Sequence, residues 1–391
     1  MVRREWTDGQ GKILAAVSAG WLLSIGVRQT FPVLLPYLQT AYGLTLTTAG
    51  LLLTVLWFAY AIGQLPGGVL ADRIGEGTTM VVSLTLAAGS VVLIVLGGPA
   101  VSLFVATALF GFTTALFGVV RLSSLSDVYP DNVGTAIGLM SAAGDLGNTL
   151  LPPLATVLAA AVAWQLGFGF AIPLFLFVAA ATWILVPRRT SPRSAGTGVS
   201  LEGVLETLSK LRTRPIVLIT AIQIVANATY QAFTGFFPTY LVTVKEFSPT
   251  IASGLFAMFF AFGIVMKPLS GIAYDRVGAR GALVVILGGS GIALATLPFV
   301  EAFWSVVAVT ALVSVMLGGG AVVLSYMAMA VPEEIQNTGL GTLRTVYMTI
   351  GAASPVLFGA IADRGFFDEA FFLLAGISAV ALSLLVWLPK R

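Results

Sequence analysis

Four ionisable residues lie inside long apolar stretches of the sequence, where a charge is most costly. They are Arg28, Asp145, Lys267 and Arg344. A charged side chain at the centre of a membrane-spanning helix costs about 2.5–3.5 kcal/mol, so such a residue is by default a candidate for function. Because three of the four are cations, an interior that contains them would favour an anionic ligand.

The two arginines have the chemistry best suited to an organic or inorganic anion. A guanidinium is planar and binds a carboxylate or a phosphate through two parallel hydrogen bonds. At helical spacing Arg28 shares a face with Trp21, Ser24 and Phe31, and Arg344 shares a face with Tyr347. The alternative for these cations, and above all for Lys267, is a bond to backbone carbonyls or a path toward the membrane surface.

A polar stripe accompanies the cations in the apolar run 215–241. Its members recur at i, i+4, i+7, i+8 and i+11, so they share one helical face: Gln223, Asn227, Tyr230, Gln231 and Thr234. Such a stripe either bonds helices together or lines a cavity, and we predict a cavity. The predicted substrate-binding residues are Arg28, Arg344, Lys267, Asn227, Tyr230, Gln231, Tyr347 and Gln64.

Asp145 is the one acidic residue that we place well inside a helix. It follows Asp131 by fourteen residues, which corresponds to about 20 Å along a helix. An ionised carboxylate at that depth needs a cation or a proton. Two roles are open: a fixed ion pair with Arg28 or Lys267, or a coupling site that takes up H⁺ or Na⁺ when an anion engages the cation.

The composition shows that water is not the main solvent of this chain. Of 391 residues, 58% are apolar and 9% are charged, whereas soluble domains carry about 25% charged residues. The absence of His and Cys removes the usual proton shuttle, disulfides and the commonest metal ligands. No phosphate-binding loop of the type G-x-x-x-x-G-K-[ST] is present. We therefore expect no enzyme, no cofactor, no metal site, no nucleic-acid partner and no nucleotide-driven pump.

Twelve apolar runs near 20 residues predict an all-α membrane protein, because each is long enough to cross a bilayer as a helix. The runs are 13–38, 47–70, 78–96, 101–125, 133–158, 164–185, 215–241, 251–274, 282–300, 303–330, 339–362 and 370–388. With the N-terminus in the cytoplasm, the outer side receives only Lys245 and Arg364. All other Lys and Arg outside the runs then lie inside, so we predict that both termini are cytoplasmic.

The long polar segment 187–214 divides the runs into six and six. Its start is rich in Pro, Ser, Gly and Arg, and its end, from Leu201 to Leu211, has the pattern of an amphipathic surface helix. We predict an N-terminal six-helix bundle at 1–186, a cytoplasmic linker at 187–214 and a C-terminal six-helix bundle at 215–391.

A short charged phrase occurs at the same place in each half. Gly68 to Gly75 and Gly271 to Gly278 both read Gly-x-x-x-Asp-Arg-x-Gly. Gln64 and Lys267, and several prolines, recur at nearly the same spacing. Repeats of this kind indicate duplication of a six-helix unit, which is a transporter architecture.

The duplicated phrase resembles the loop 2–3 signature of the major facilitator superfamily and its loop 8–9 copy, and the resemblance covers essentially the whole chain. The signature usually ends in two basic residues, but the first copy here ends in Glu76-Gly77. We expect its charged residues to form a cytoplasmic gate, with Asp72 paired to Arg121 in one conformation. The predicted gate residues are Asp72, Arg73, Arg121, Asp275, Arg276 and Arg280.

The stretches "VRQTFPVLLPYL" at 27–38 and "GQLPGGVLADRIG" at 63–75 are similar to the anion:cation symporter branch and related organic-anion branches. We therefore expect a monomeric secondary transporter in the cytoplasmic membrane that moves a small anion by alternating access, with H⁺ or Na⁺ as coupling ion. The alternatives are an efflux antiporter for drugs or amphiphiles and a membrane sensor that transports nothing. The Gly-Pro signature of drug–proton antiporters would fall at Leu151-Pro152 and matches poorly.

Overall fold

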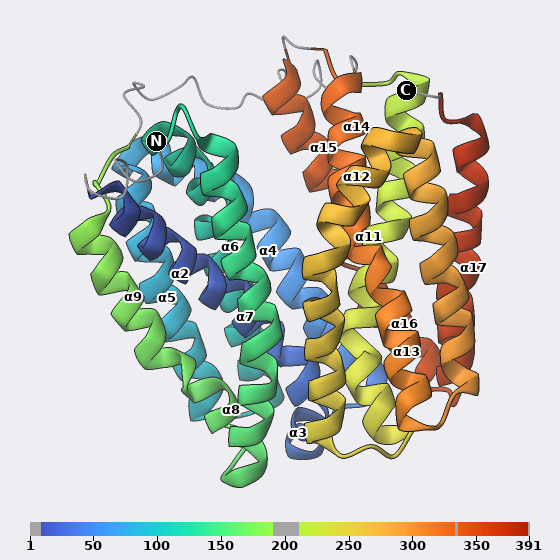
Figure 1. Ribbon diagram of the computed structural model, residues 1–391. Coiled ribbons are helices and arrows are strands. Elements are labelled where there is room, and N and C mark those ends of the chain that lie inside the picture. Colours follow the sequence, from blue (N-terminus) through green and yellow to red (C-terminus); the bar gives the residue numbers. More distant parts are fainter. Residues whose placement is uncertain (1–8, 191–210, 333–334, 390–391) are drawn as a thin grey trace. The chain divides into compact units, whose positions relative to one another are not determined.

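The structure, a computed structural model, describes residues 9–190, 211–332 and 335–389 (Figure 1). Every regular element within these ranges is helical, and none of the described residues lies in a strand. The all-α prediction is therefore confirmed. The amphipathic helix predicted from Leu201 to Leu211 lies outside the described residues, except for Leu211 itself.

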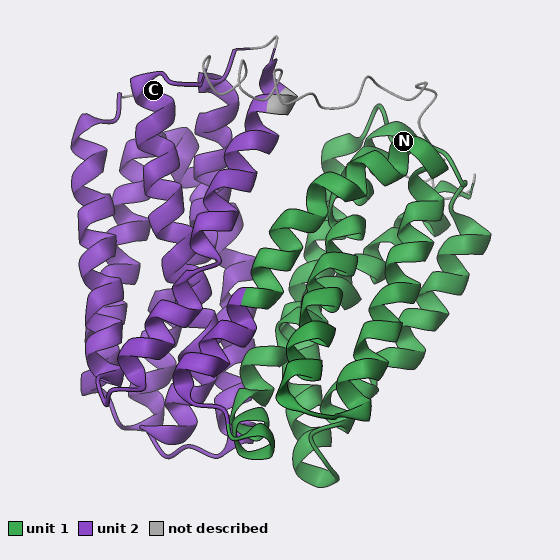
Figure 2. Ribbon diagram, turned by 180° about the vertical axis from the view of Figure 1, so that it is seen from behind, with its two compact units in different colours: residues 1–43, 55–198 green, residues 44–54, 199–391 purple. Residues whose placement is uncertain are grey.

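The chain divides into two compact units, coloured separately in Figure 2. Unit 1 comprises residues 1–43 and 55–198, and unit 2 comprises residues 44–54 and 199–391. Helix α4 begins in unit 2 and continues into unit 1. Together with α4 (Leu46–Ile74), the helices of unit 1 are α2 (Gln10–Arg28), α3 (Thr30–Tyr42), α5 (Glu76–Leu96), α6 (Ala100–Val128), α7 (Val133–Ala161), α8 (Leu166–Gly169) and α9 (Ala171–Leu185).

Unit 2 is also built from long apolar helices joined by short turns. Its elements are α11 (Arg214–Thr243), α12 (Pro249–Thr296), η1 (Leu297–Phe299), α13 (Phe303–Val313), η2 (Ser314–Gly318), α14 (Gly319–Ala330), α15 (Gln336–Gly351), α16 (Ser354–Ala362), α17 (Phe367–Leu384) and η4 (Leu385–Trp387).

Ten helical segments of the described chain are long and apolar enough to cross a membrane. One of them, Pro249–Phe299, contains Gly278, whose φ of 73° and ψ of 172° are not helical. The predicted helices 251–274 and 282–300 are the two parts of this segment. Helix α7 corresponds to the predicted run 133–158 but is not among the ten. The count of twelve spans therefore stays a prediction.

In three of the predicted helices, an α-helix ends four residues before a proline. Proline has no N–H, so the carbonyl four residues earlier receives no helical hydrogen bond. The pairs of last helical residue and proline are Arg28 and Pro32, Gly169 and Pro173, and Gly351 and Pro355. The first break places Arg28 at the end of α2, within the longer apolar segment Gln10–Tyr42.

Glycines bring the helices of unit 1 into backbone contact. A Cβ atom added to Gly26 of α2 would lie 2.7 Å from the Gly147 carbonyl oxygen of α7. A Cβ atom added to Gly63 of α4 would lie 2.7 Å from the Phe112 carbonyl oxygen of α6. Small residues permit this approach in membrane helices. As a result α2 lies directly on α7, and α4 lies directly on α6.

The start of α4 belongs to unit 2 because it is bound to the end of α16. The Leu46 backbone N–H donates to Asp363 Oδ1 at 3.2 Å, and the Thr47 hydroxyl donates to Asp363 Oδ2 at 2.7 Å. Thr54 Oγ1 accepts a hydrogen bond from the Val356 N–H at 3.2 Å. Asp363 thus supplies an N-terminal cap to a helix that is distant in sequence. The hydrogen bond from Thr47 is the main cause that lowers the pKa of Asp363.

This cap predicts an acid-sensitive contribution to stability. Since the folded pKa of Asp363 lies below its ordinary value, the stabilisation is present above about pH 4 and is lost as pH falls through the folded pKa. We expect Asp363→Asn, which keeps an acceptor oxygen but removes the charge at the start of α4, to lower the free energy of unfolding at pH 7 by about 0.3–1 kcal/mol. Thermal unfolding of the purified protein against pH would measure it. A difference between wild type and variant that persists unchanged below pH 3 would contradict the assignment.

Candidate functional site

Arg28 is enclosed by three aromatic rings of unit 1. Its guanidinium carbon lies 3.9 Å from the ring centre of Tyr60, 5.4 Å from that of Trp57 and 5.5 Å from that of Trp21. The side chain is 1% exposed, and Nε donates to the Ser24 carbonyl oxygen at 3.0 Å. Arg28 thus contacts Trp21 and Ser24, two of the three residues that helical spacing placed on its face. The third, Phe31, lies in α3 beyond the break. The break after α2 positions the cation, and α4 supplies the other two rings.

A second buried arginine, Arg121 of α6, stacks on the same tryptophan. Its guanidinium carbon lies 3.5 Å from the ring centre of Trp21, and the side chain is 6% exposed. The sequence predicted Arg121 to be a partner for Asp72. In the structure Asp72 is exposed, and no described residue forms an ion pair with its carboxylate, so this pair is not formed here. Arg121 instead belongs to the cluster around Trp21.

The electrostatics of Arg28 are those of a buried cation that lacks its counterion. Nη1 is buried and has no hydrogen-bond partner, and none of the described carboxylates forms an ion pair with this guanidinium. Contacts with aromatic faces contribute about 2 kcal/mol when they are desolvated, whereas burial of an ion costs several kcal/mol. An anion that enters the cluster would supply both the opposite charge and an acceptor for Nη1.

Asp145 lies on α7 and directly follows Gly144, which packs against Trp21. A Cβ atom added to Gly144 would collide with the Trp21 indole nitrogen, so α7 and the indole are in direct contact. The Asp145 side chain is half-buried. The fixed ion pair with Arg28 is not formed in the structure. The pair with Lys267, a residue of unit 2, stays a prediction.

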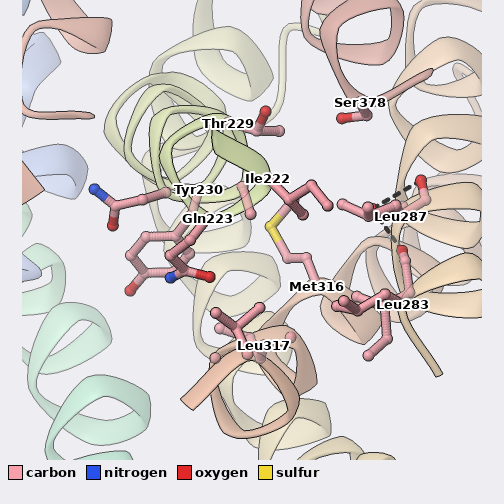
Figure 3. Close-up of a pocket in the computed structure, with 16 residues that line it drawn as sticks. Ile222, Gln223, Thr229, Tyr230, Leu283, Leu287, Met316, Leu317 and Ser378 are labelled. Atoms are coloured by element: carbon pink, nitrogen blue, oxygen red, sulfur yellow. Dashed lines mark hydrogen bonds between the residues drawn. The ribbon is translucent and has the colours of Figure 1, made fainter. Parts of the chain in front are cut away.

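Unit 2 contains a cavity of about 210 Å³ between α11, the second part of α12, η2, α14 and α17 (Figure 3). Three members of the predicted polar stripe line it: Gln223, Asn227 and Tyr230. The other two, Gln231 and Thr234, are buried but do not line it. The stripe is thus divided between a cavity wall and a helix contact.

The remaining predicted binding residues lie outside this cavity. Arg344 is half-buried on α15, and its buried Nε has no hydrogen-bond partner. The Tyr347 carbonyl oxygen accepts a hydrogen bond from Asn227 Nδ2 at 3.2 Å, which links α11 to α15. Lys267 on α12 and Gln64 on α4 are half-buried.

A sequence model described as Major Facilitator Superfamily matches residues 17–348 and 248–391. These two matches together include nearly all of the chain. The chain belongs to the Major Facilitator Superfamily. It is therefore a multi-pass membrane transporter and not an enzyme.

Within the superfamily, two curated relatives are similar along most of their length. The probable sulfoacetate transporter SauU of Cupriavidus necator is 24% identical over 402 residues, which include 94% of this chain and 92% of the relative. The hexuronate transporter of Bacillus subtilis is 24% identical over 378 residues, with 90% and 88% covered. A crystal structure of a mutant of the nucleoside transporter NupG has a TM-score of 0.83 at 12% identity and covers 97% of this chain and all of that one. This last likeness shows the fold alone.

The first copy of the superfamily phrase binds the start of the predicted linker. The Gly77 N–H donates to the Arg188 carbonyl oxygen at 3.1 Å, and the Thr190 N–H donates to Glu76 Oε2 at 2.9 Å. Arg189 Nη2 donates to the Asp72 carbonyl oxygen at 3.0 Å and thus caps the C-terminal end of α4. Glu76 and Gly77, which depart from the usual basic ending, are the residues that receive this part of the linker.

The contact predicts that Gly77 tolerates no side chain. A Cβ atom there would collide with the Pro187 carbonyl oxygen, whereas a Cβ atom at Gly68 of the same phrase would meet nothing within 4 Å. We expect Gly77→Ala to lower the free energy of unfolding by about 1–3 kcal/mol. Gly68→Ala is the matched control and should be neutral or stabilising by up to about 1 kcal/mol. Thermal unfolding of both variants measures the difference, and equal stabilities would show that the linker does not dock here.

The second glycine of each phrase has the same unusual backbone, which supports the duplication. Gly75 has a φ of 91° and Gly278 a φ of 73°, a region that favours glycine. The first glycine of each phrase makes no close approach, since a Cβ atom added to Gly68 or to Gly271 would have no neighbour within 4 Å. Asp275 and Arg276 are exposed, and Arg280 is half-buried.

Sequence reasoning missed Trp57 and Tyr60 as residues of the site. Both lie on α4, three residues apart, and therefore on one helical face. A pair of large polar-edged aromatics at this spacing in a spanning helix, in the same half as a buried arginine, was the available signal. Their role depends on the packing of α4 against its neighbours, which the spacing alone does not give.

Proposed function

We propose that this chain is a secondary transporter that moves a small organic anion across the cytoplasmic membrane. The observation that carries the proposal is Arg28, a cation that is 1% exposed, ringed by aromatic faces and left with an unpartnered buried Nη1. A carboxylate or sulfonate would provide the missing acceptor through charge-assisted hydrogen bonds. The printed names of the relatives, a sulfoacetate and a hexuronate transporter, are both consistent with an anionic solute.

In this proposal the rings of Trp21, Trp57 and Tyr60 stabilise the position of Arg28, and Arg28 selects an anionic ligand by its charge. Trp21 contacts the guanidinium groups of both Arg28 and Arg121, so the two cations are oriented by one rigid ring. Like charges near one ring increase the demand for an anion. Arg344, with its buried unpartnered Nε, is the corresponding candidate in unit 2.

The transport cycle is alternating access, in which the binding site opens to one side of the membrane at a time. We propose twelve spans in bundles at 1–186 and 215–391, joined by the linker 187–214, with both termini in the cytoplasm. The break at Gly278 and the 29-residue length of α7 support the count of spans. The distribution of Lys and Arg supports the orientation.

We further propose that Asp145 couples the anion to H⁺ or Na⁺. Its helix is in contact with Trp21 through Gly144, the residue before Asp145, and Trp21 contacts both buried cations. A change in charge at the cluster would alter the electrostatic environment of this carboxylate. Coupling requires that binding of the anion changes the affinity of this carboxylate for H⁺ or Na⁺.

Uptake into proteoliposomes tests the function directly. Radiolabelled sulfoacetate and glucuronate represent the sulfonate and carboxylate classes, and uncharged glucose is the control. We expect saturable uptake of at least one anion, with no uptake of glucose. Uptake that does not distinguish anions from glucose would contradict the proposal.

The second candidate function is efflux of uncharged amphiphiles, and one observation favours it. None of the residues that line the cavity of unit 2 is charged. The 2-nitroimidazole transporter of Escherichia coli is 24% identical over 370 residues, or 91% of each chain. Export of an uncharged ring compound from inverted vesicles, without transport of any anion, would select this alternative.

A further inference from the structure

The cavity of unit 2 has two chemically different walls. Gln223, Thr229 and Tyr230 on α11 form a polar wall. Leu283 and Leu287 on α12 and Met316 on η2 are apolar, and Figure 3 shows the two leucines across the cavity from Gln223 and Tyr230. Burial of a ligand between such walls requires an apolar body with a small number of polar groups.

Two polar atoms on the α11 wall have no partner. Gln223 Oε1 is buried without a hydrogen bond, and so is the hydroxyl of Thr229, whose side chain is 2% exposed. The hydroxyls of Ser290 and Ser378 are satisfied within their own helices, since Ser290 donates to the Ile286 carbonyl and Ser378 to the Leu374 carbonyl. A buried polar atom without a partner costs about 1–3 kcal/mol. The cavity therefore has an acceptor, Gln223 Oε1, ready for a donor.

The charge of the lining residues and the volume of the cavity define which ligands fit it. None of the lining residues is charged, so the cavity, unlike the cluster around Arg28, offers an anion no opposite charge. An engineered apolar cavity of about 150 Å³ binds benzene. The present cavity, at about 210 Å³, has room for a larger ring system.

We propose that this cavity is a second ligand site, specific for an uncharged molecule of about the size of indole that carries one N–H or O–H donor. The donor bonds to Gln223 Oε1, the Thr229 hydroxyl is available to a second polar group, and the ring packs against Leu283, Leu287 and Met316. The site lies wholly within unit 2. It goes beyond the proposed anion transport, because it needs neither Arg28 nor an anion.

Calorimetric titration of the purified, detergent-solubilised protein with three probes tests this site. Indole has the donor, indene has the same shape without it, and indole-3-carboxylate adds a charge. We expect saturable binding of indole, at least tenfold weaker binding of indene and no binding of the carboxylate at this site. Titration into protein-free micelles corrects for partition into detergent.

Four variants locate the binding. Gln223→Leu should remove the preference for indole over indene, while Gln231→Leu, on the same helix but away from the cavity, should keep it. Ala226→Phe should fill the cavity and abolish binding of both rings. Arg28→Ala should leave indole binding unchanged, which separates failure of this site from failure of the anion site.

Each outcome decides the question. Absence of saturable indole binding to the folded wild type would overturn the proposal and leave a cavity filled by water. Equal effects of Gln223→Leu and Gln231→Leu would place the binding elsewhere. If Ala226→Phe does not fold, the ratio of indole to indene affinity in Gln223→Leu is sufficient by itself.

Discussion

Replacement of Arg28 by alanine is expected to weaken anion binding by at least about 100-fold. A guanidinium that binds a carboxylate or sulfonate with two charge-assisted hydrogen bonds contributes about 1.5–3 kcal/mol for each, and about 1.4 kcal/mol corresponds to a factor of ten. Arg28→Lys should recover little of the loss. An ammonium keeps the charge but lacks the planar fork, and it stacks less well on Trp21 and Tyr60. Binding isotherms of the purified variants with sulfoacetate or glucuronate measure both effects.

Arg188→Ala is the matched control for this experiment. Arg188 also stacks on a tryptophan, with its guanidinium carbon 4.9 Å from the ring centre of Trp183, but its side chain is exposed. This variant should bind the anion as wild type does. Unfolding temperatures must show that Arg28→Ala is folded. If the folded Arg28→Ala variant retains full affinity, the anion site lies elsewhere, with Arg344 as the next candidate.

Replacement of Asp145 by asparagine is expected to separate transport from its driving force. Asparagine keeps the size and hydrogen-bonding capacity of the side chain but does not take up a proton or attract Na⁺. Exchange of labelled for unlabelled anion across the proteoliposome membrane should therefore persist. Accumulation of the anion against its own gradient, driven by a proton or sodium gradient, should disappear.

Asp131→Asn is a suitable control, because Asp131 is exposed before the first turn of α7 and Asp145 is half-buried within that helix. The control should both exchange and accumulate. If Asp145→Asn still concentrates the anion to the wild-type level, Asp145 has a structural role and coupling takes place elsewhere. Loss of exchange together with accumulation would instead indicate that Asp145 is needed for binding or for folding.

Much of the local structure followed from the sequence because it depends on short-range chemistry. Arg28 was placed on a face with Trp21, Ser24 and Phe31 by helical spacing alone, and the contacts with Trp21 and Ser24 are present. The duplicated phrase indicated a repeated unit, and Gly75 and Gly278, which end its two copies, both have positive φ. The helical class followed from apolar runs of bilayer length, since a backbone in lipid must satisfy its own hydrogen bonds.

The effect of proline was less predictable. Arg28, Gly169 and Gly351 each end a helix four residues before a proline. However, Pro66 and Pro152 lie inside helices that continue without interruption. The missing N–H is the same in all cases, so packing around each helix decides whether the chain bends or continues. A sequence pattern does not contain that information.

The sequence by itself determined that this protein is an all-helical membrane transporter with a duplicated plan and charges inside its apolar runs. Those features depend on composition and on spacing along one helix. Only the tertiary structure decided which charges meet. In the structure Arg28 and Arg121 both contact the Trp21 indole, and Asp363 accepts a hydrogen bond from the first residue of α4. Part of the α11 polar stripe lines a cavity and the rest is buried outside it. These contacts join residues from different helices, and their geometry is fixed by close packing between helices, which no periodicity along a single helix encodes.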